Sequence, residues 1–127
     1  MLDHIGFAVS NFEKSKAFYE KALAPLDIKV LMEVTAEMTG CDAHCGFGTD
    51  KPEFWIGTGE PLTGSLHVAF TAPSRAVVDA FYEAAMAAGG RDNGAPGLRP
   101  HYHENYYGAF VLDPDGHNIE AVCHRPE

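Results

Sequence analysis

The sequence repeats itself at a constant offset of 63 residues, and this repeat is its strongest constraint on the fold. The shift places His4 on His67, and it places the run AFYE at 17–20 on an identical run at 80–83. Two copies of this length nearly use up the 127 residues, so we expect one domain over 1–127. It would consist of a first repeat over 1–63 and a second over 64–127.

Within each repeat, the spacing of apolar residues predicts one strand, one helix and three further strands. Ser10 and Glu13 form a capping-box pattern that begins the first helix, which should end near Pro25. Ser74 is the expected N-cap of the second helix, which should stop at the glycine pair 89–90. The stretch 89–100 is rich in Gly and Pro and is expected to form a loop, apart from a short strand near 91–95. The strands are expected near 2–9, 27–34, 43–49, 53–58, 66–72, 91–95, 105–113 and 117–124.

The last two strands should form a hairpin, because a DPDG turn lies between them at 113–116. The pattern as a whole predicts an α+β fold made of two βαβββ units.

Charge and hydropathy exclude several function classes. The formal net charge is -9, with 18 acidic and 9 basic residues, which argues against nucleic-acid binding and against anchoring on anionic lipid. No apolar run reaches transmembrane length, and the start MLDHIGFAV lacks the pattern of a signal peptide. We therefore expect a cytoplasmic protein without disulfides, in keeping with its odd number of three cysteines.

Strand alternation places two histidines and one glutamate on the face turned away from the helices. His4 and His67 each precede small residues on that face, in the first strand of their repeat. The apolar residues that alternate with these small residues along the strand should pack on the helices. In the last strand, Glu120 falls on the same side as the histidines. Two imidazoles and a carboxylate suit Fe, Mn, Zn, Ni or Co, so we predict one divalent metal ion per chain.

Two other groups of residues are candidates for chemistry. The cluster PHYHENYY at 100–107 offers His101, Tyr102, His103 and Tyr107 as acid–base or substrate-orienting residues, with a solvated loop as the alternative. Three potential zinc ligands also lie close together, but a closed structural zinc site needs four, so unligated thiols are expected there instead. These three are Cys41, His44 and Cys45, and the nearby aromatic residues Phe47, Phe54 and Trp55 are expected in the core or a pocket wall.

Three segments carry a resemblance to a known family. They are LDHIGFAVSNFEKSKAFYEKAL at 2–23, LHVAFTAPSRAVVDAFYEAA at 66–85, and YYGAFVLDPDGHNIEAV at 106–122. Together they resemble the vicinal oxygen chelate superfamily, which includes glyoxalase I, extradiol dioxygenases and bleomycin-resistance proteins. The resemblance implies a half-open mixed β-barrel built from the two repeats. It also implies a metal that holds two neighbouring oxygens of a substrate, with His4, His67 and Glu120 as its ligands.

One departure from the family pattern bears on the reaction. Glyoxalase-type members carry a fourth ligand in the last strand of the first half, where the offset of 63 maps Glu120 onto Gly57. The neighbours Trp55 and Ile56 cannot ligate a metal, and Glu53 and Glu60 would need a register shift. An efficient glyoxalase I is therefore not expected.

The sequence thus predicts a metal-dependent enzyme of the dioxygenase, lyase, isomerase or transferase type. Its partners should be a small-molecule substrate and a second copy of the chain in a homodimer. The alternative is a non-enzymatic protein that sequesters a small molecule, like the bleomycin-resistance proteins.

Overall fold

The computed structural model describes residues 1–35, 37, 40 and 42–127. Each half contains one long helix and four strands, as the sequence predicts. The first half comprises β1 (Ile5–Ala8), α1 (Phe12–Ala22), the short 3-10 helix η1 (Ala24–Leu26), β2 (Lys29–Val34), β3 (His44–Gly48) and β4 (Phe54–Gly57). The second comprises β5 (His67–Thr71), α3 (Arg75–Ala87), β6 (Arg91–Leu98), β7 (Tyr107–Leu112) and β8 (Asn118–Cys123).

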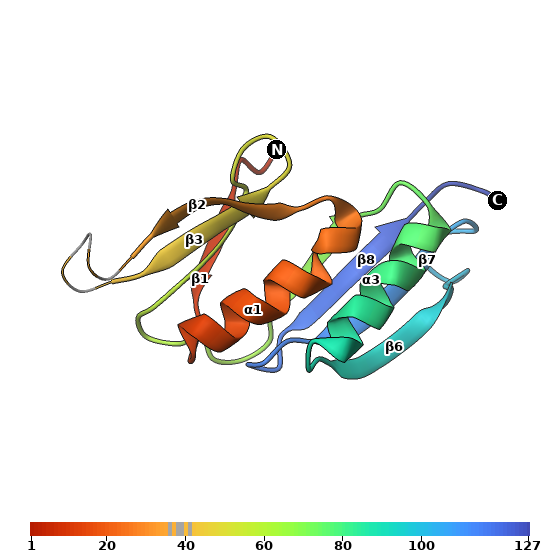
Figure 1. The fold of residues 1–127 in the computed structure, drawn as a ribbon. Helices are drawn as coiled ribbons and strands as arrows, with labels where there is room; N and C mark the ends of the chain where they lie inside the picture. Colours follow the sequence, from red (N-terminus) through yellow and green to blue (C-terminus); the bar gives the residue numbers. More distant parts are fainter. Residues whose placement is uncertain (36, 38–39, 41) are drawn as a thin grey trace.

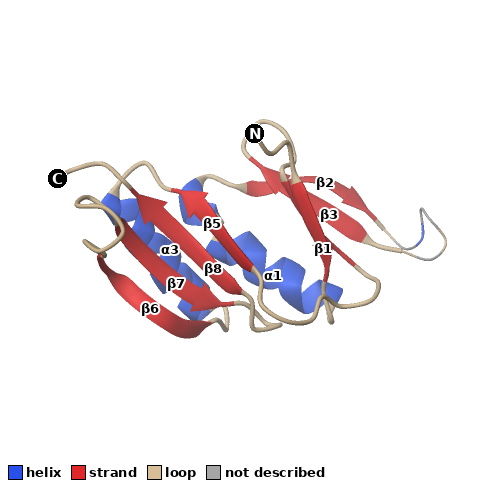
Figure 2. Ribbon diagram, turned by 180° about the vertical axis from the view of Figure 1, so that it is seen from behind, coloured by secondary structure: helices blue, strands red, loops and turns tan. Residues whose placement is uncertain are grey.

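The two halves have the same sheet topology. The strand orders are β1-β4-β3-β2 and β5-β8-β7-β6, with the first pair of each sheet parallel and the others antiparallel. The helices α1 and α3 lie on one side of the sheets (Figure 1), and no helix of the described residues covers the opposite side (Figure 2). The α+β fold of paired βαβββ units is confirmed, and the two sheets are not closed into a barrel. No helix in the described part is long and apolar enough to span a membrane.

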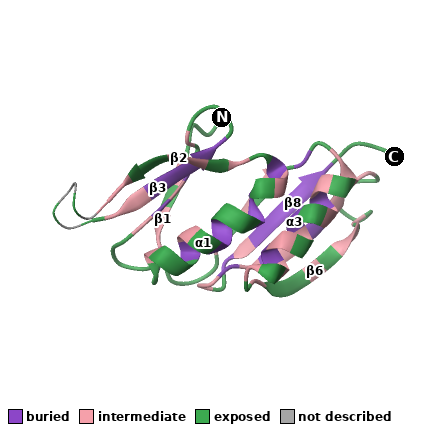
Figure 3. Ribbon diagram, in the orientation of Figure 1, coloured by how far each residue is buried: buried purple, intermediate pink, exposed green. Residues whose placement is uncertain are grey.

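The core lies between the helices and the covered faces of the sheets (Figure 3). Phe18 from α1 and Phe81 from α3 are buried there, together with alternate residues of the central strands. Phe54 of β4 and Phe70 of β5 touch edge to face, with ring centroids 5.2 Å apart, and so join the two halves. Because one face of the central strands is buried in this core, their register is fixed, and so is the set of their residues on the open face.

A buried carboxylate also joins the halves. Asp113, which is 1% exposed at the start of the DPDG turn, accepts hydrogen bonds from the backbone N–H groups of Asp115 and His117, each at 2.9 Å. Tyr19 of α1 donates its hydroxyl hydrogen to the other Asp113 oxygen. Burial, followed by the charge and hydrogen bond of Asp113, raises the pKa of Tyr19 well above its usual value. The turn closes the expected hairpin, with Gly116 at φ 87° donating its N–H to the Asp113 carbonyl oxygen.

Replacing this carboxylate should cost considerable stability. Asp113→Ala leaves three donors without their acceptor, two of them buried, and we expect the free energy of unfolding to fall by about 3 kcal/mol or more. Tyr19→Phe keeps the ring packing and should cost only about 1 kcal/mol. The exposed Asp50→Ala is the matched control, within about 0.5 kcal/mol of the unmodified chain. Urea denaturation measures all three, and an Asp113→Ala loss no larger than that of the control would contradict the role of the network.

Two local expectations were wrong. The N-cap of α1 is Asn11, whose side chain accepts the Lys14 N–H, rather than Ser10. Ser10 instead donates its N–H and hydroxyl hydrogens to Asp115, which lies in the turn of the other half. The Gly/Pro-rich loop is also shorter than expected, because β6 continues to Leu98 as an edge strand with irregular register, where proline is tolerated.

Candidate metal centre

A histidine and a glutamate meet on the open face of the second sheet. His67 begins β5, and Glu120 lies in the middle of β8, the parallel neighbour of β5. His67 Nε2 is 2.8 Å from Glu120 Oε1. The Glu120 side chain is 0% exposed, whereas that of His67 is 52% exposed. The structure therefore brings two of the three predicted ligands together and leaves the imidazole open to solvent.

Tyr106 completes the surroundings of this carboxylate. Its hydroxyl donates to Glu120 Oε2, so both carboxylate oxygens have a partner. Burial raises the pKa of Tyr106, and the hydrogen bond and charge of Glu120 raise it further. Gly108 makes room for the pair, because a Cβ there would lie 3.1 Å from both Glu120 Oε2 and the Tyr106 ring. Sequence reasoning missed Tyr106, although side-chain alternation along β7 could have indicated which tyrosine faces Glu120.

Tyr107, the tyrosine selected from the sequence, lies on the opposite side of the sheet. Its hydroxyl donates to Asp79 of α3 at 2.6 Å, and the Arg75 guanidinium lies 5.3 Å from its ring centroid. The Asp79 hydrogen bond, followed by burial, raises the pKa of Tyr107 to about 12. The geometry thus places Tyr107 in the contact between helix and sheet, away from Glu120.

The other residues of the predicted cluster form an aromatic group beside Tyr106. The rings of Tyr102 and His124 lie 5.0 Å and 5.1 Å from that of Tyr106. The His103 ring centroid lies 5.7 Å from that of His124, and His103 Nδ1 accepts a backbone hydrogen bond from Asn105, while the His101 ring centroid lies 4.2 Å from that of Tyr102. Of the three predicted loop residues, Tyr102 is therefore the one whose ring contacts Tyr106 directly, and the His101 ring contacts that of Tyr102.

His4, the third predicted ligand, lies on the other sheet. Its Nδ1 is 2.7 Å from Asp3 Oδ1, and Asp3 also pairs with Lys51 at 2.6 Å. The Lys51 hydrogen bond, then that of His4, lowers the pKa of Asp3 to about 2. His4 lines a pocket of about 200 Å³ that includes residues of β1, β4 and β5. Within the described residues, no group of three or more His, Cys, Asp or Glu side chains is placed to hold a metal.

The strand pairing corrects the expected position of the missing fourth ligand. Gly6 pairs with Trp55 across β1 and β4, and its repeat equivalent Ala69 pairs with Glu120 across β5 and β8. Glu120 therefore corresponds to Trp55, two residues before Gly57. The offset changes because the second half is longer by two residues between these paired positions, with 51 positions from Ala69 to Glu120 against 49 from Gly6 to Trp55. Because side chains alternate along a strand, a shift of two residues selects another side chain on the same open face. That side chain is Trp55, which cannot ligate a metal, so the fourth-ligand position still carries no ligand.

The sequence cluster that suggested zinc is split between two faces. His44 points to the open face of β3, whereas Cys45 is fully buried in the core. Burial raises the pKa of the Cys45 thiol to about 12, which disfavours the thiolate. Cys45 and Cys123 are free thiols, and Cys41 lies outside the described residues.

Comparison with known proteins gives a family that agrees with this geometry. A family model described as the glyoxalase/bleomycin resistance protein/dioxygenase superfamily matches residues 1–121. The chain belongs to this superfamily. A search of functionally curated proteins gives no match.

Solved structures of superfamily members share the fold. A glyoxalase/bleomycin resistance protein from Albidiferax ferrireducens is 30% identical, with 99% of each chain covered and a TM-score of 0.77. A mutant of FosX, a fosfomycin resistance protein from Listeria monocytogenes, is 21% identical, with 97% and 91% covered and a TM-score of 0.69. It is complexed with Mn(II) and 1S,2S-dihydroxypropylphosphonic acid. A glyoxalase I mutant from Zea mays is 18% identical, with 99% of this chain but 46% of that chain covered and a TM-score of 0.72.

The donor set of the second sheet fits two ligands of a superfamily metal. An imidazole nitrogen and a carboxylate oxygen are common ligands of divalent transition metals at about 2.0–2.2 Å, which places two such ligand atoms about 3 Å apart. The separation of 2.8 Å between His67 Nε2 and Glu120 Oε1 is close to that value. Tyr106 would orient the carboxylate from the outer shell.

Proposed function

We propose that this protein is a metal-dependent enzyme of the superfamily, with His67 and Glu120 as two ligands of one divalent ion. The buried Glu120 carboxylate carries this proposal. A carboxyl group without solvent exposure costs free energy unless its oxygens have hydrogen-bond partners, and both oxygens of Glu120 have one. Glu120 lies on the face without helices, beside a half-exposed imidazole, where packing of the core gives no reason for a charge.

We assign the third ligand to His4 of a second copy of the chain. His4 is exposed and lies on the first sheet, outside hydrogen-bond reach of His67 and Glu120. The edge strands β1 and β5 belong to separate sheets and lie apart from each other in the middle of the molecule (Figure 2), so neither edge is paired with the other. A homodimer in which one copy's first sheet faces the other's second sheet would complete the trio and cover the edges.

The proposed reaction is polar chemistry on a small molecule with two neighbouring oxygens or one oxyanion. A bound ion of the Fe, Mn, Zn, Ni or Co type would supply Lewis acidity. Tyr106 holds Glu120 in one orientation. Tyr102 and His124 contact the Tyr106 ring, and His103 contacts His124, so these three side chains would position a substrate or carry a proton. The FosX complex with Mn(II) supports the choice of a divalent ion.

A binding module without catalysis is the second candidate. It is favoured by the absence, within the described residues, of a third ligand beside His67 and Glu120. Such a protein would bind a small molecule with the same affinity whether or not a divalent ion is present.

Metal content tests the proposal directly. We expect the unmodified protein, purified without chelator, to bind about one divalent ion per chain, and His67→Ala and Glu120→Ala to lose tight binding. Glu104→Gln, an exposed change in the neighbouring loop, is the control and should retain the ion. Elemental analysis and calorimetric titration with Mn²⁺ and Zn²⁺ give the readout. Metal content equal to the control in both ligand variants would refute the site.

Tyr106→Phe should weaken metal binding without abolishing it. Removing the hydroxyl leaves Glu120 Oε2 without its partner and frees the carboxylate to rotate, so we expect a loss in affinity of about 10–100-fold. Tyr102→Phe is the matched control, since the Tyr102 ring contacts Tyr106 and the change removes only an exposed hydroxyl. Calorimetric titration measures the metal affinity of both variants. Equal affinities would show that Tyr106 does not act on the proposed metal ligand Glu120.

A further inference from the structure

We propose that residues 124–127 form a clamp segment that holds Tyr106 against Glu120, and that Glu127 is the residue that anchors this segment. The inference deepens the proposed function, because it rests on the assignment of Glu120 as a metal ligand. Glu127 is a positioning residue for that ligand, since it acts on Glu120 only through His124 and Tyr106.

Tyr106 reaches a long way along the sheet to meet Glu120. In the antiparallel pairing of β7 with β8, Gly108 lies opposite Val122 and Phe110 lies opposite Glu120. Tyr106 therefore begins four residues away from the position opposite Glu120, which is about 13 Å along a strand. Its hydroxyl nevertheless donates to Glu120 Oε2, and its ring lies over Gly108. A side chain that leans this far needs neighbouring rings to keep its direction.

Two rings flank Tyr106 and keep it in this direction. The ring centroids of Tyr102 and His124 lie 5.0 Å and 5.1 Å from that of Tyr106. Tyr102 is 61% exposed in a loop, whereas His124 directly follows the buried strand β8. Continuing the pairing of β7 and β8 by one residue places His124 opposite Tyr106 on the open face, and the two rings meet edge to face at 88°. His124 is therefore the flank that is tied to the sheet.

Glu127 fixes the far end of the clamp segment on the helix side of the sheet. The chain leaves β8 beside the start of α3 (Figure 1), where Arg75 donates its backbone N–H to Glu127 Oε2 at 3.3 Å. The same oxygen lies 3.3 Å from Arg75 Nε, which is buried and has no hydrogen-bond partner among the described residues. Glu127 therefore supplies an opposite charge to a buried cation. Because the Arg75 guanidinium also lies over the Tyr107 ring, the start of β7 is held from both faces.

The clamp segment is too short and stiff to absorb movement at one end. Only two residues separate His124 from Glu127, and one of them is Pro126, whose ring fixes its φ angle. The other, Arg125, donates its backbone N–H to the sulfur of the buried Cys123 at 3.4 Å. A displacement of Glu127 should therefore be passed on to His124.

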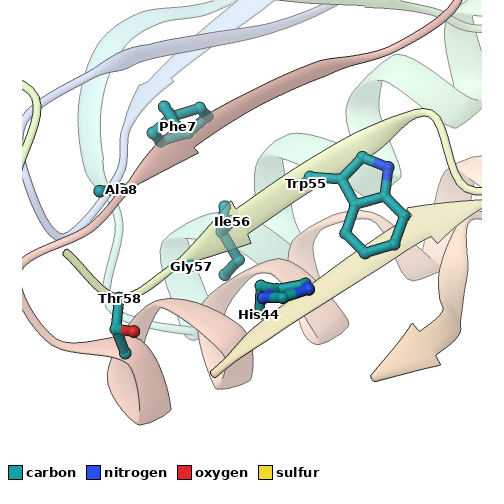
Figure 4. A pocket seen from close by; sticks show the side chains of 7 residues that line it. All are labelled: Phe7, Ala8, His44, Trp55, Ile56, Gly57 and Thr58. Atoms are coloured by element: carbon teal, nitrogen blue, oxygen red, sulfur yellow. The ribbon is translucent and has the colours of Figure 1, made fainter. Parts of the chain in front are cut away.

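The first half lacks this arrangement within its described residues. Strand pairing makes His44 the equivalent of Gly108, because each lies opposite the residue two positions after Trp55 or Glu120. Figure 4 shows the His44 imidazole near Trp55, and their ring centroids lie 5.8 Å apart. A side chain thus fills the space that the Tyr106 ring crosses in the second half. The clamp accompanies the half with the buried carboxylate, as expected if it serves that carboxylate.

NMR of the metal-free protein tests the clamp itself. Nuclear Overhauser effects between the rings of His124 and Tyr106, and between the Tyr106 ring and the Gly108 α-protons, should both weaken in Glu127→Ala. Glu127→Gln keeps a hydrogen-bond acceptor but not the charge, so it should give an intermediate result. Glu83→Gln removes an exposed charge from α3 and is the matched control, with both effects unchanged. Molar salt should move the unmodified protein toward the Glu127→Ala pattern and leave that variant unaffected.

Calorimetric titration with Mn²⁺ tests the positioning role. An exposed ion pair changes an equilibrium constant only a few-fold, so we expect Glu127→Ala to bind Mn²⁺ about two- to five-fold more weakly than the Glu83→Gln control. In a Tyr106→Phe background the same substitution should have no further effect, because the hydroxyl that the clamp positions is already absent.

Each possible failure has a separate meaning. Unchanged Overhauser effects in Glu127→Ala would refute the clamp, whatever the metal result. Weakened effects with unchanged Mn²⁺ affinity, or an equal additional loss in the Tyr106→Phe background, would refute the positioning role. If the unmodified protein bound no Mn²⁺, the proposed function would fall and the positioning role with it, whereas the ring contacts alone would still decide the clamp.

Discussion

A heterodimer of His4→Ala and His67→Ala chains is expected to recover one tight metal site, although neither variant alone binds the ion tightly. The expectation follows from the separation of the ligands, since His67 meets Glu120 on the second sheet and His4 lies on the first. If each site combines one chain's His4 with the other chain's His67 and Glu120, one of the two sites in the heterodimer receives both mutations. The other site receives none, and it should bind with the affinity of the unmodified protein.

The reciprocal mixture gives the opposite result. A chain that carries both substitutions, paired with an unmodified chain, damages both shared sites and should bind no ion tightly. Sites completed within one chain would reverse the outcomes, with no site in the first heterodimer and one in the second. Both substituted side chains are exposed, so neither substitution leaves a cavity in the core. Two affinity tags allow isolation of each heterodimer, and elemental analysis then counts the ions. Sedimentation equilibrium must first show a dimer, and a monomer at high micromolar concentration would refute the assignment of His4 to a second copy.

The strands and helices could be predicted because each has a strong local pattern. Alternation in 66–72 fixes which residues of β5 face the core, and Ser74 caps α3 as expected. The pairing of His67 with Glu120 follows from the same alternation, since both residues fall on the open face of adjacent strands. Local periodicity was therefore enough to find two members of the candidate centre.

The remaining features depend on contacts between distant residues. Ser10 and Asn11 are both good N-cap residues, and only the bond from Ser10 to Asp115, in the other half, decides between them. Tyr106 and Tyr107 are neighbours in the sequence and so point to opposite faces of the sheet. An error of one residue in the predicted strand register is therefore enough to select the wrong tyrosine. The repeat predicts that His4 and His67 occupy equivalent positions on the open face, but it does not say whether they meet within one chain or across a dimer, and the two lie on separate sheets.

We expect the protein to be an inefficient glyoxalase I, and the corrected strand pairing strengthens this expectation. That reaction moves a proton between adjacent carbons and needs a base opposite the existing carboxylate. The equivalent position is Trp55, whose indole cannot accept a proton. Glu53, two residues earlier on the same face, lies about 7 Å along the strand, in the pocket that contains His4.

The test is isomerisation of the methylglyoxal–glutathione adduct by the Ni, Co and Zn forms of the protein. We expect a specificity constant well below about 10⁴ M⁻¹s⁻¹, the lower end of the range for ordinary enzymes. Trp55→Glu is the informative companion, because it places a carboxylate at the repeat equivalent of Glu120, where Gly6 and Gly46 leave room for it. A rate at or above that limit in the unmodified protein would contradict the prediction. Loss of such a rate in Glu53→Gln would then identify Glu53 as the base, whereas loss in Tyr106→Phe alone would place proton transfer beside Glu120.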